Sequence, residues 1–436
     1  MNLKEVLLSY WIKLKNNIFY RNIAIVAGGN IAARLIGIVT TPIITRLYSP
    51  EDYGVYSIFV SIFGIIGSLS TLRYSITIPI ADNEDSADNI LKLCFLITSI
   101  LSFLLFLIVS IFRDSISRYY DSENLKPFLW LIPVVFFFTG IYEALINRTL
   151  RQKQFRIITR TKLNQSISSS VIKIGLGTIK IGPWGLFLGQ IAQEAAGIGT
   201  LFSRLLKARP TIFKSFSWDN IRNVAKRYKN FPLVQSWSQL LLALSSQLPV
   251  LLLATLYGPR AAGIFGLANS MINLPMDLIG QSVAQVYYAE ISKYGKDNLP
   301  RIYSFSLSIS KKLLIFGMIP TIVLILFGPQ LFLIVFGKEW HEAGRYAQLL
   351  SIYFLFRFIS APIMNCLNVL EKQALQLVFN ISRVIVLLLA FYISYKLKLT
   401  INKTVFLYSI INTILYLLII VRTFIFLKPK NPNVKS

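Results

Sequence analysis

About a dozen apolar stretches fill this chain of 436 residues between Asn22 and Leu427, and each is long enough to cross a bilayer. The hydrocarbon core of a bilayer is about 30 Å thick, so a helix needs about 20 apolar residues to span it. Helices satisfy their own backbone hydrogen bonds where no water is present. Because 54% of the residues are hydrophobic and only 15% are charged, little sequence remains for a soluble domain. We therefore expect an all-α polytopic membrane protein.

A short segment of the chain occurs twice. Residues 47–56 read LYSPEDYGVY and residues 256–265 read LYGPRAAGIF, so that Leu, Tyr, Pro and Gly coincide at a constant offset of 209. A junction duplicated half a chain apart indicates two equivalent lobes, an arrangement typical of transporters. We expect six spans in each lobe, and therefore about twelve transmembrane helices.

The spacing of the apolar runs predicts five parts. They are an amphipathic N-terminal segment (1–21), an N-terminal lobe (22–206), a basic linker (207–230), a C-terminal lobe (231–427) and a tail (428–436). Within the lobes we expect one span at 54–80, another at 184–206, and a short outer interfacial helix at 328–337. Lys and Arg gather in the loops after even-numbered spans, which places both termini, the N-terminal segment, the linker and the tail in the cytoplasm. This placement accounts for most of the net charge of +26 without a nucleic-acid partner.

Basic residues also occur inside the predicted spans, where a charge is costly unless it faces a water-filled cavity or a partner. There are five of them: Arg34, Arg73, Lys173, Arg357 and Arg383. Guanidinium groups bind phosphate oxygens in a bidentate manner, so these residues predict a cationic cavity for an anionic substrate. The alternative interpretation is a side chain that reaches the interface or pairs with a buried acid.

Three acidic residues lie within the spans: Glu143, Glu194 and Asp277. Asp277 follows Pro275, where a broken helix would expose backbone groups together with the carboxylate. Each acid is a candidate for coupling to a proton or sodium ion, or for neutralising a nearby arginine.

The two repeated junctions are candidates for gating. Pro42 and Pro50 bracket the end of the first span with Arg46 between them, and proline permits a helix to bend. Rocking about 42–54 and 251–263 would also involve Gly54 and its counterparts, so the predicted gating residues are Pro42, Arg46, Pro50, Gly54, Pro259 and Gly263. A plain helix terminus with an interfacial arginine is the alternative.

The chain offers little for metal or cofactor chemistry. It has two cysteines, Cys94 and Cys366, and one histidine, His341. These are too few for a zinc site or a disulfide framework. No phosphate-binding loop of the GxxxxGK[ST] kind occurs. We expect no metal, no cofactor and no catalytic residue, and hence a transporter rather than an enzyme.

Residues 30–59, NIAARLIGIVTTPIITRLYSPEDYGVYSIF, and residues 70–90, STLRYSITIPIADNEDSADNI, resemble Wzx-type polysaccharide and O-antigen repeat-unit flippases. These belong to the multidrug/oligosaccharidyl-lipid/polysaccharide exporter superfamily. The resemblance implies two six-helix lobes that form a V around a central cavity, with Arg34 and Arg73 matching the family's basic residues. It implies translocation of undecaprenyl-pyrophosphate-linked oligosaccharide across the bacterial inner membrane by alternating access, for O-antigen, capsule or exopolysaccharide. Membrane lipids, the polymerase and the chain-length machinery are the implied partners.

Two other functions stay open. A drug or metabolite antiporter on the same fold would depend on acids such as Asp277. A membrane enzyme of polysaccharide assembly, such as a polymerase or ligase, usually needs a substantial outer loop, and the predicted outer loops are short. Cavity shape rather than a linear motif selects the sugar, so neither the sugar nor the coupling ion follows from the sequence.

Overall fold

The structure, a computed structural model, describes residues 18–210, 212, 217–294, 298–370 and 372–428. Over these ranges the chain is helical throughout and forms no strand. Seven helices in the described part are long and apolar enough to cross a membrane, and they are α4, α6, α11, α13, α14, α16 and α17. The chain is therefore an all-α, multi-pass membrane protein. The twelve-span layout in two lobes around a central cavity stays a prediction.

The chain divides into two compact units. Unit 1 comprises Met1–Tyr48 and Ile62–Leu240, and unit 2 comprises Ser49–Ser61 and Leu241–Ser436. The helix α3 (Pro50–Gly67) therefore contributes its first part to unit 2 and its last part to unit 1. The predicted N-terminal segment 1–21 lies largely outside the described residues, as does the tail 428–436.

Unit 1 contains eight further helices in the described ranges. They are α2 (Ile18–Leu47), α4 (Glu84–Tyr119), α5 (Lys126–Leu129), α6 (Leu131–Arg151), α7 (Phe155–Thr178), α8 (Trp184–Ala195), α9 (Ile198–Ala208) and α10 (Trp218–Arg227), with the short helical turns η1 (Tyr74–Ile80), η2 (Glu123–Leu125) and η3 (Phe231–Gln235). Small and hydroxyl side chains allow α2 and α7 to approach closely. Ser166 Oγ donates a hydrogen bond to the Ala33 carbonyl at 2.6 Å, and the hydroxyls of Thr40 and Ser170 are 3.1 Å apart.

Two predicted spans of unit 1 are interrupted. The span expected at 54–80 is wrong in its second half, because α3 ends at Gly67 and the chain turns before η1. Leu72 and Arg73 have φ values of 46° and 62° in this turn. Serine and threonine in the run SLST compete with the helix by bonding to nearby backbone, as Ser68 does with the Ile65 carbonyl. The span expected at 184–206 breaks at Gly197, whose φ of 101° separates α8 from α9.

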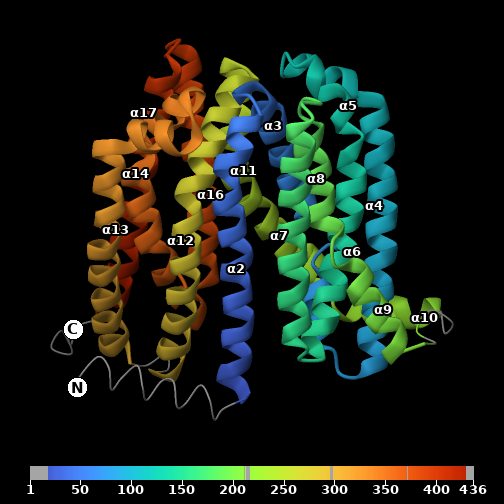
Figure 1. The fold of residues 1–436 in the computed structure, drawn as a ribbon. Coiled ribbons are helices and arrows are strands. Elements are labelled where there is room, and N and C mark those ends of the chain that lie inside the picture. Colours follow the sequence, from blue (N-terminus) through green and yellow to red (C-terminus); the bar gives the residue numbers. More distant parts are fainter. Residues whose placement is uncertain (1–17, 211, 213–216, 295–297, 371, 429–436) are drawn as a thin grey trace. The chain divides into compact units, whose positions relative to one another are not determined.

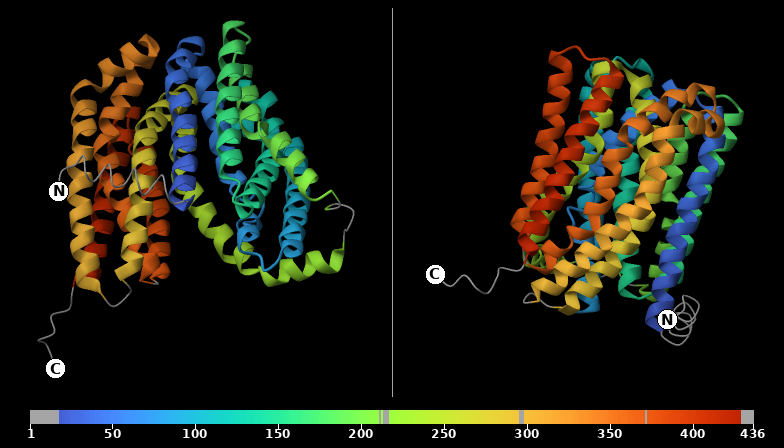
Figure 2. Two further views of the ribbon diagram at one scale, coloured as in Figure 1. Left: turned by 60° about the horizontal axis from the view of Figure 1, so that its bottom comes forward. Right: turned by 90° about the vertical axis from the view of Figure 1, so that its left-hand side faces the viewer.

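The linker predicted at 207–230 carries an amphipathic helix in its described part. Ile221 and Val224 of α10 are buried in an apolar cluster that also contains residues of α4, α6 and α9. Arg227 of the same helix forms an ion pair with Asp82 at 2.7 Å. In Figures 1 and 2, α10 lies crosswise to the long helices of unit 1, at one end of α4.

Unit 2 contains the remaining helices of the described ranges. They are α11 (Ser236–Tyr257, mostly in unit 2), α12 (Pro259–Tyr294), α13 (Leu299–Phe336), η4 (Lys338–Trp340), α14 (His341–Ile363), α15 (Cys366–Val369), α16 (Gln373–Lys396) and α17 (Ile401–Leu427). The helix α12 is continuous past Pro275, so the helix break considered at that proline does not occur. Figure 2 shows the long helices of this unit running alongside one another.

The separate outer helix predicted at 328–337 is wrong, because this segment is the last part of the 38-residue helix α13. Pro329 has no N–H to donate to the carbonyl of Ile325, four residues earlier. The side-chain amide of Gln348 on α14 donates a hydrogen bond to that carbonyl instead. Close packing of Gly328 against Gly344 brings α13 and α14 together at this level. The helix therefore continues across the proline.

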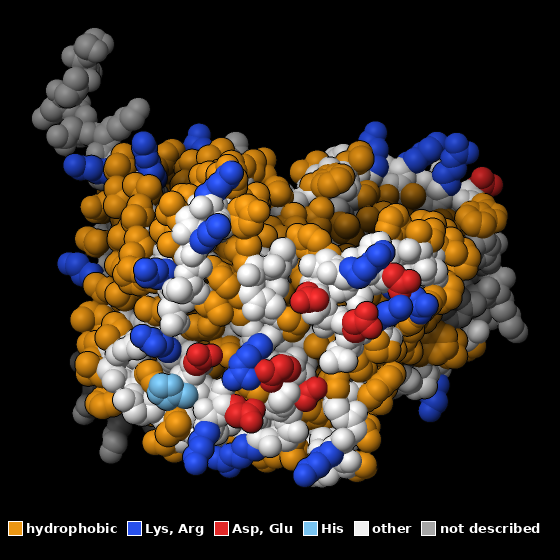
Figure 3. All heavy atoms as spheres, turned by 90° about the horizontal axis from the view of Figure 1, so that it is seen from above, with side chains coloured by type: hydrophobic (Ala, Val, Ile, Leu, Met, Phe, Trp, Pro, Cys, Tyr) orange, Lys and Arg blue, Asp and Glu red, His pale blue; other side chains and the backbone are white. Residues whose placement is uncertain are grey.

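Charged side chains lie mainly at the ends of the helices. Figure 3 looks onto the end that is uppermost in Figure 1, and acidic and basic side chains gather there among hydrophobic ones. Hydrophobic side chains cover the flanks of α13, where Ile315, Ile319 and Ile334 are 67%, 64% and 69% exposed. Such exposed apolar flanks are the surface that hydrocarbon chains of a bilayer would contact.

Candidate functional site

Arg73 lies beside a carboxylate of the same unit. Its Nη1 is 3.9 Å from Glu143 Oε1, and both side chains are about one quarter exposed. The hydroxyls of Ser75 and Ser70 donate to Glu143 at 2.8 and 3.1 Å. Arg73 Nε is buried and makes no hydrogen bond within the described residues. The predicted substrate-binding residue Arg73 and the predicted coupling residue Glu143 thus form one group, with a donor left for a further acceptor.

Glu194, on α8, is the second predicted coupling residue in unit 1. It accepts hydrogen bonds from Thr139 at 3.0 Å and Gln190 at 3.1 Å. It also interacts electrostatically with Lys162 and Lys173 of α7. Glu143 and Glu194 therefore each lie near at least one cation, which is the arrangement that the alternative interpretation describes.

Lys162 is not among the five basic residues predicted inside the spans. It lies on α7, half-buried, where it interacts electrostatically with Arg34 of α2 and with Glu194. Lys162 and Lys173 are separated by about three helical turns, and so share one face of α7. Once the helix is known to start at Phe155, this spacing predicts that Lys162 lies on the same face as Lys173.

The two predicted cations of unit 2 face one polar cavity. Arg357 on α14 and Arg383 on α16 both line a cavity of about 260 Å³. Arg357 donates to the Asn273 side chain at 2.8 Å, and Arg383 stacks its guanidinium 4.9 Å from the Tyr416 ring centre. Arg383 Nε is buried without a hydrogen bond in the described structure.

The other polar residues of this cavity were not predicted. They are Ser245, Ser246, Gln247, Asn269, Asn273, Tyr353, Tyr408, Asn412 and Tyr416. Three of them, Tyr408, Asn412 and Tyr416, recur every four residues along α17, a spacing that places them on one face. This polar stripe in an otherwise apolar helix was the available signal.

The repeated junctions meet in unit 2, where α3 and α12 cross. A Cβ at Gly54 would lie 2.0 Å from the Pro259 carbonyl oxygen, and one at Gly263 would lie 2.2 Å from the Pro50 carbonyl oxygen. These two contacts are equivalent, because the offset of 209 relates Gly54 to Gly263 and Pro50 to Pro259. The repeats therefore pack by the same face, with glycine at each point of closest approach. Four of the predicted gating residues come together in this α3–α12 crossing.

Glu51 and Arg260, which are equivalent positions of the two repeats, face each other beside this crossing. Arg260 Nη1 donates to Glu51 Oε1 at 2.5 Å, and both side chains are about half exposed. Partial burial of the Glu51 carboxyl opposes ionisation, but the Arg260 guanidinium together with hydrogen bonds from the backbone and Ser49 outweighs it and holds the pKa of Glu51 below its ordinary value of 4.5. The hydrogen bond to Glu51 in turn raises the pKa of Arg260.

The other two predicted gating residues lie at the end of α2. Pro42 is inside this helix, which continues to Leu47, and Arg46 is exposed in the last turn. The Thr41 hydroxyl donates to the Gly37 carbonyl, and the Thr45 hydroxyl donates to the carbonyl of Pro42 itself. The side chain of the last predicted coupling residue, Asp277, lies outside the described part of the structure.

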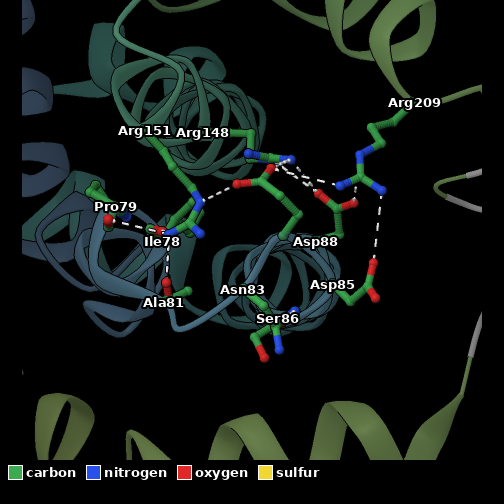
Figure 4. A network of polar contacts seen from close by, with 11 residues as sticks. Ile78, Pro79, Ala81, Asn83, Asp85, Ser86, Asp88, Arg148, Arg151 and Arg209 are labelled. Atoms are coloured by element: carbon green, nitrogen blue, oxygen red, sulfur yellow. Dashed lines mark hydrogen bonds and ion pairs between the residues drawn. The ribbon is translucent and has the colours of Figure 1, made fainter.

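A network of ion pairs holds one end of unit 1 together (Figure 4). Arg148 of α6 is only 2% exposed and contacts Asp88 at 2.8 Å and Glu84 at 2.6 Å, both on α4. Arg151 contacts Glu84 and donates to the carbonyls that end η1, including that of Ala81 at 2.7 Å. The network joins α4, α6 and η1, and its buried arginine serves the fold of this unit.

Comparison of the sequence with known proteins gives two matches. A family described as polysaccharide biosynthesis protein matches residues 43–345. The teichuronic acid biosynthesis protein TuaB of Bacillus subtilis (strain 168) is 22% identical over 282 residues, which are 64% of this chain and 56% of that protein. The chain thus spans a little more than half the length of that relative.

Comparison of the structure gives the fold. An inward-facing multidrug resistance MATE family transporter of the MOP superfamily matches with a TM-score of 0.71 and 14% identity, over 92% of this chain and 98% of that one. Lipid II flippase MurJ in an inward closed conformation matches with a TM-score of 0.71 and 15% identity, over 92% of this chain and 89% of that one. The fold is therefore that of membrane transporters and flippases.

Proposed function

This chain belongs to the polysaccharide biosynthesis protein family, and from that premise we propose that it is a flippase for undecaprenyl-pyrophosphate-linked oligosaccharide. It would move the repeat unit across the bacterial cytoplasmic membrane by alternating access, with both termini in the cytoplasm. The product would supply the synthesis of a surface polysaccharide such as O-antigen, capsule or exopolysaccharide. A polymerase and the chain-length machinery would receive it on the outer side.

The observation that carries the proposal is the cavity of unit 2 with two guanidinium groups. It is built from α11, α12, α14, α16 and α17, and four of these helices are among those apolar enough to cross a membrane. Charges within such helices are costly and usually serve a substrate pathway. Arginine, tyrosine and amide side chains together suit a cargo that carries phosphate oxygens and sugar hydroxyls.

Unit 1 would contribute through exchange of counter-ions. Arg73 lies beside Glu143, while Lys162 and Lys173 lie near Glu194. An entering pyrophosphate would compete with these carboxylates for the same cations. Glu143 and Glu194, once released, would be the groups able to take up a proton or sodium ion. Their uptake, or the membrane potential at about 2.3 kcal/mol per charge per 100 mV, would bias the cycle.

The test uses a strain that lacks this protein and has no redundant flippase. We expect undecaprenyl-linked oligosaccharide to accumulate in the inner leaflet, protected from a membrane-impermeant glycan-modifying enzyme. The wild-type chain restores access, whereas Arg34→Gln and Arg73→Gln insert normally but do not. Arg222→Gln, at an exposed position of α10, is the matched control. Intermediates that are already outside but unpolymerised would refute the flippase and indicate a later enzyme.

A cation-coupled antiporter is the second candidate. It is favoured by Glu194, a carboxylate surrounded by polar donors near two lysines, on a fold shared with a multidrug transporter. The same strain separates the two functions. Drug sensitivity without accumulation of lipid-linked oligosaccharide, reproduced by Glu194→Gln, would favour the antiporter.

A further inference from the structure

Three cavities of unit 2 follow one another along α12 and α14, and each shares lining residues with the next. An apolar groove of about 250 Å³ and a smaller cavity of about 140 Å³ are both lined by Met276 and Phe358. The smaller cavity and the polar cavity of about 260 Å³ are both lined by Asn273 and Arg357. The three form one track, which is apolar at one end and polar at the other.

The apolar end is suited to a hydrocarbon chain. It lies among α12, α13 and α14, and most of its lining consists of side chains such as Met271, Phe316 and Leu324. Its two hydroxyls are occupied within their own helices, because Thr321 bonds to the Gly317 carbonyl and Ser351 to the Gln348 carbonyl. Neither of these hydroxyls therefore needs a polar ligand.

The groove opens on the surface of α13. Phe316 and Val323 line it and are 53% and 40% exposed. Their neighbours Ile319 and Ile322 are 64% and 46% exposed on the same apolar flank. A hydrocarbon chain in the bilayer would therefore reach the groove laterally.

The polar end has the chemistry of a sugar and anion site. Tyr353 packs against the rings of Tyr408 and Tyr416 at 5.7 and 5.6 Å, and Arg383 lies over Tyr416. Together with the amides of this cavity, these groups offer hydrogen bonds and aromatic faces. Its volume lies just below the roughly 300–1,000 Å³ of drug-sized ligand sites, which suits one sugar unit rather than a whole oligosaccharide.

Arg357 lies between the apolar end and the polar end of the track. It lines both the smaller cavity, beside Phe354 and Phe358, and the polar cavity. Its guanidinium lies 5.5 Å from the ring centre of Phe354 and bonds to Asn273. In an amphiphile that joins a lipid chain to a sugar through phosphate, the phosphate occupies this same intermediate position. Guanidinium is the side chain best suited to phosphate oxygens.

We propose that unit 2 binds the lipid-linked cargo along this track. The polyprenyl chain lies in the α12–α13–α14 groove, the phosphate lies at Arg357, and the first sugar lies among Tyr353, Tyr408 and Tyr416. A single groove accommodates one chain, which favours a polyprenyl lipid over a two-chain phospholipid. This assignment rests on the proposed flippase function and adds to it the position of each part of the cargo.

Photolabelling tests the groove. The probe is undecaprenyl monophosphate with a diazirine on the first isoprene units, applied to the full-length protein in nanodiscs. We expect label on the α13 and α14 residues of the groove. Val323→Trp fills the groove and should reduce labelling roughly tenfold, whereas Ile322→Trp puts the same ring on an exposed neighbour outside the lining and should change it less than about twofold. Equal loss in both variants would overturn the assignment.

A comparison of charged and uncharged probes tests the phosphate position at Arg357. Arg357→Gln should weaken binding of the phosphate probe roughly tenfold but leave binding of the matching uncharged undecaprenol probe unchanged. Arg357→Lys should restore part of the difference, which a merely structural role would not produce. Equal weakening of both probes would contradict a phosphate at Arg357.

Competition between unlabelled lipids and the probe distinguishes failure of the track from failure of the proposed function. Unlabelled undecaprenyl phosphate should displace the probe, and phosphatidylglycerol at the same mole fraction should not. Equal displacement by phosphatidylglycerol would show an ordinary lipid groove and overturn the track. Label confined to unit 1 would also overturn the track, while leaving the flippase function intact. If undecaprenyl phosphate protects no site in the chain, both the track and the proposed function are wrong.

Discussion

The α3–α12 crossing tolerates no side chain at Gly54 or Gly263. A Cβ would lie 2.0 Å from the Pro259 carbonyl oxygen at Gly54 and 2.2 Å from the Pro50 carbonyl oxygen at Gly263, whereas ordinary contacts begin at 3.4 Å. Both obstacles are backbone atoms, so no rotamer change relieves them. Either alanine therefore forces the two helices apart.

That displacement sets the expected cost. A gap of about 0.5–1 Å already forfeits a quarter to a half of the dispersion energy of each contact, and overpacking of this kind typically costs about 1–3 kcal/mol. For a domain with the length of unit 2, each kcal/mol lowers the unfolding midpoint by roughly 2–4 °C. We expect Gly54→Ala and Gly263→Ala each to lower the midpoint of the purified protein by roughly 2–12 °C. Both should also reduce export of the polysaccharide.

The double variant is the sharper test. A single separation of the helices makes room for both methyl groups, so the double variant should lose clearly less than the sum of the single losses. Gly37→Ala is the control, because a Cβ there meets nothing within 4 Å. Unchanged midpoints in both single variants, or strictly additive losses in the double one, would refute the reciprocal crossing.

Three further outcomes follow from the ion pairs. Arg148→Ala removes the close partner of the buried Asp88, which keeps Arg209 at 3.8 Å, and should destabilise unit 1 by about 3–5 kcal/mol, measured as loss of folded protein on heating, whereas Arg113→Ala at an exposed pair should cost less than about 1 kcal/mol. Glu51→Arg should impair export through repulsion with Arg260, and the swap Glu51→Arg with Arg260→Glu should restore it; failure of the swap would mean that the pair does not act as a pair. Because the folded-state pKa of Glu51 is depressed, its contribution is complete above pH 4.5 and is lost as the pH falls through the lower folded-state pKa, so wild type and Glu51→Gln should differ in midpoint at about pH 6 and converge in strong acid.

Local sequence properties were sufficient for the class of fold and for the repeat. A run of about 20 apolar residues has few states open to it other than a membrane helix, and hydropathy is read from neighbouring residues alone. The pattern PxxxG at 50–54 and 259–263 likewise marked the two helices that cross in unit 2. It carried no information on which part of one helix touches the other.

Breaks within the helices were harder to foresee. The turn at Leu72 and Arg73 and the break at Gly197 fall inside stretches whose length alone predicts a single span. The continuity of α13 across Pro329 depends on Gln348 of the following helix, α14, which supplies the hydrogen bond that the proline cannot make. Such compensation between helices is not visible in the hydropathy of either one.

The sequence by itself determined that charged residues lie inside apolar helices, since that is a matter of position along the chain. Only the tertiary structure decided their partners: Arg73, in the turn before η1, lies beside Glu143 of α6, and Arg357 and Arg383 share a cavity with tyrosines of α17. The physical reason is that the cost of a charge depends on which neighbours folding brings within a few ångströms, and those neighbours come from other helices.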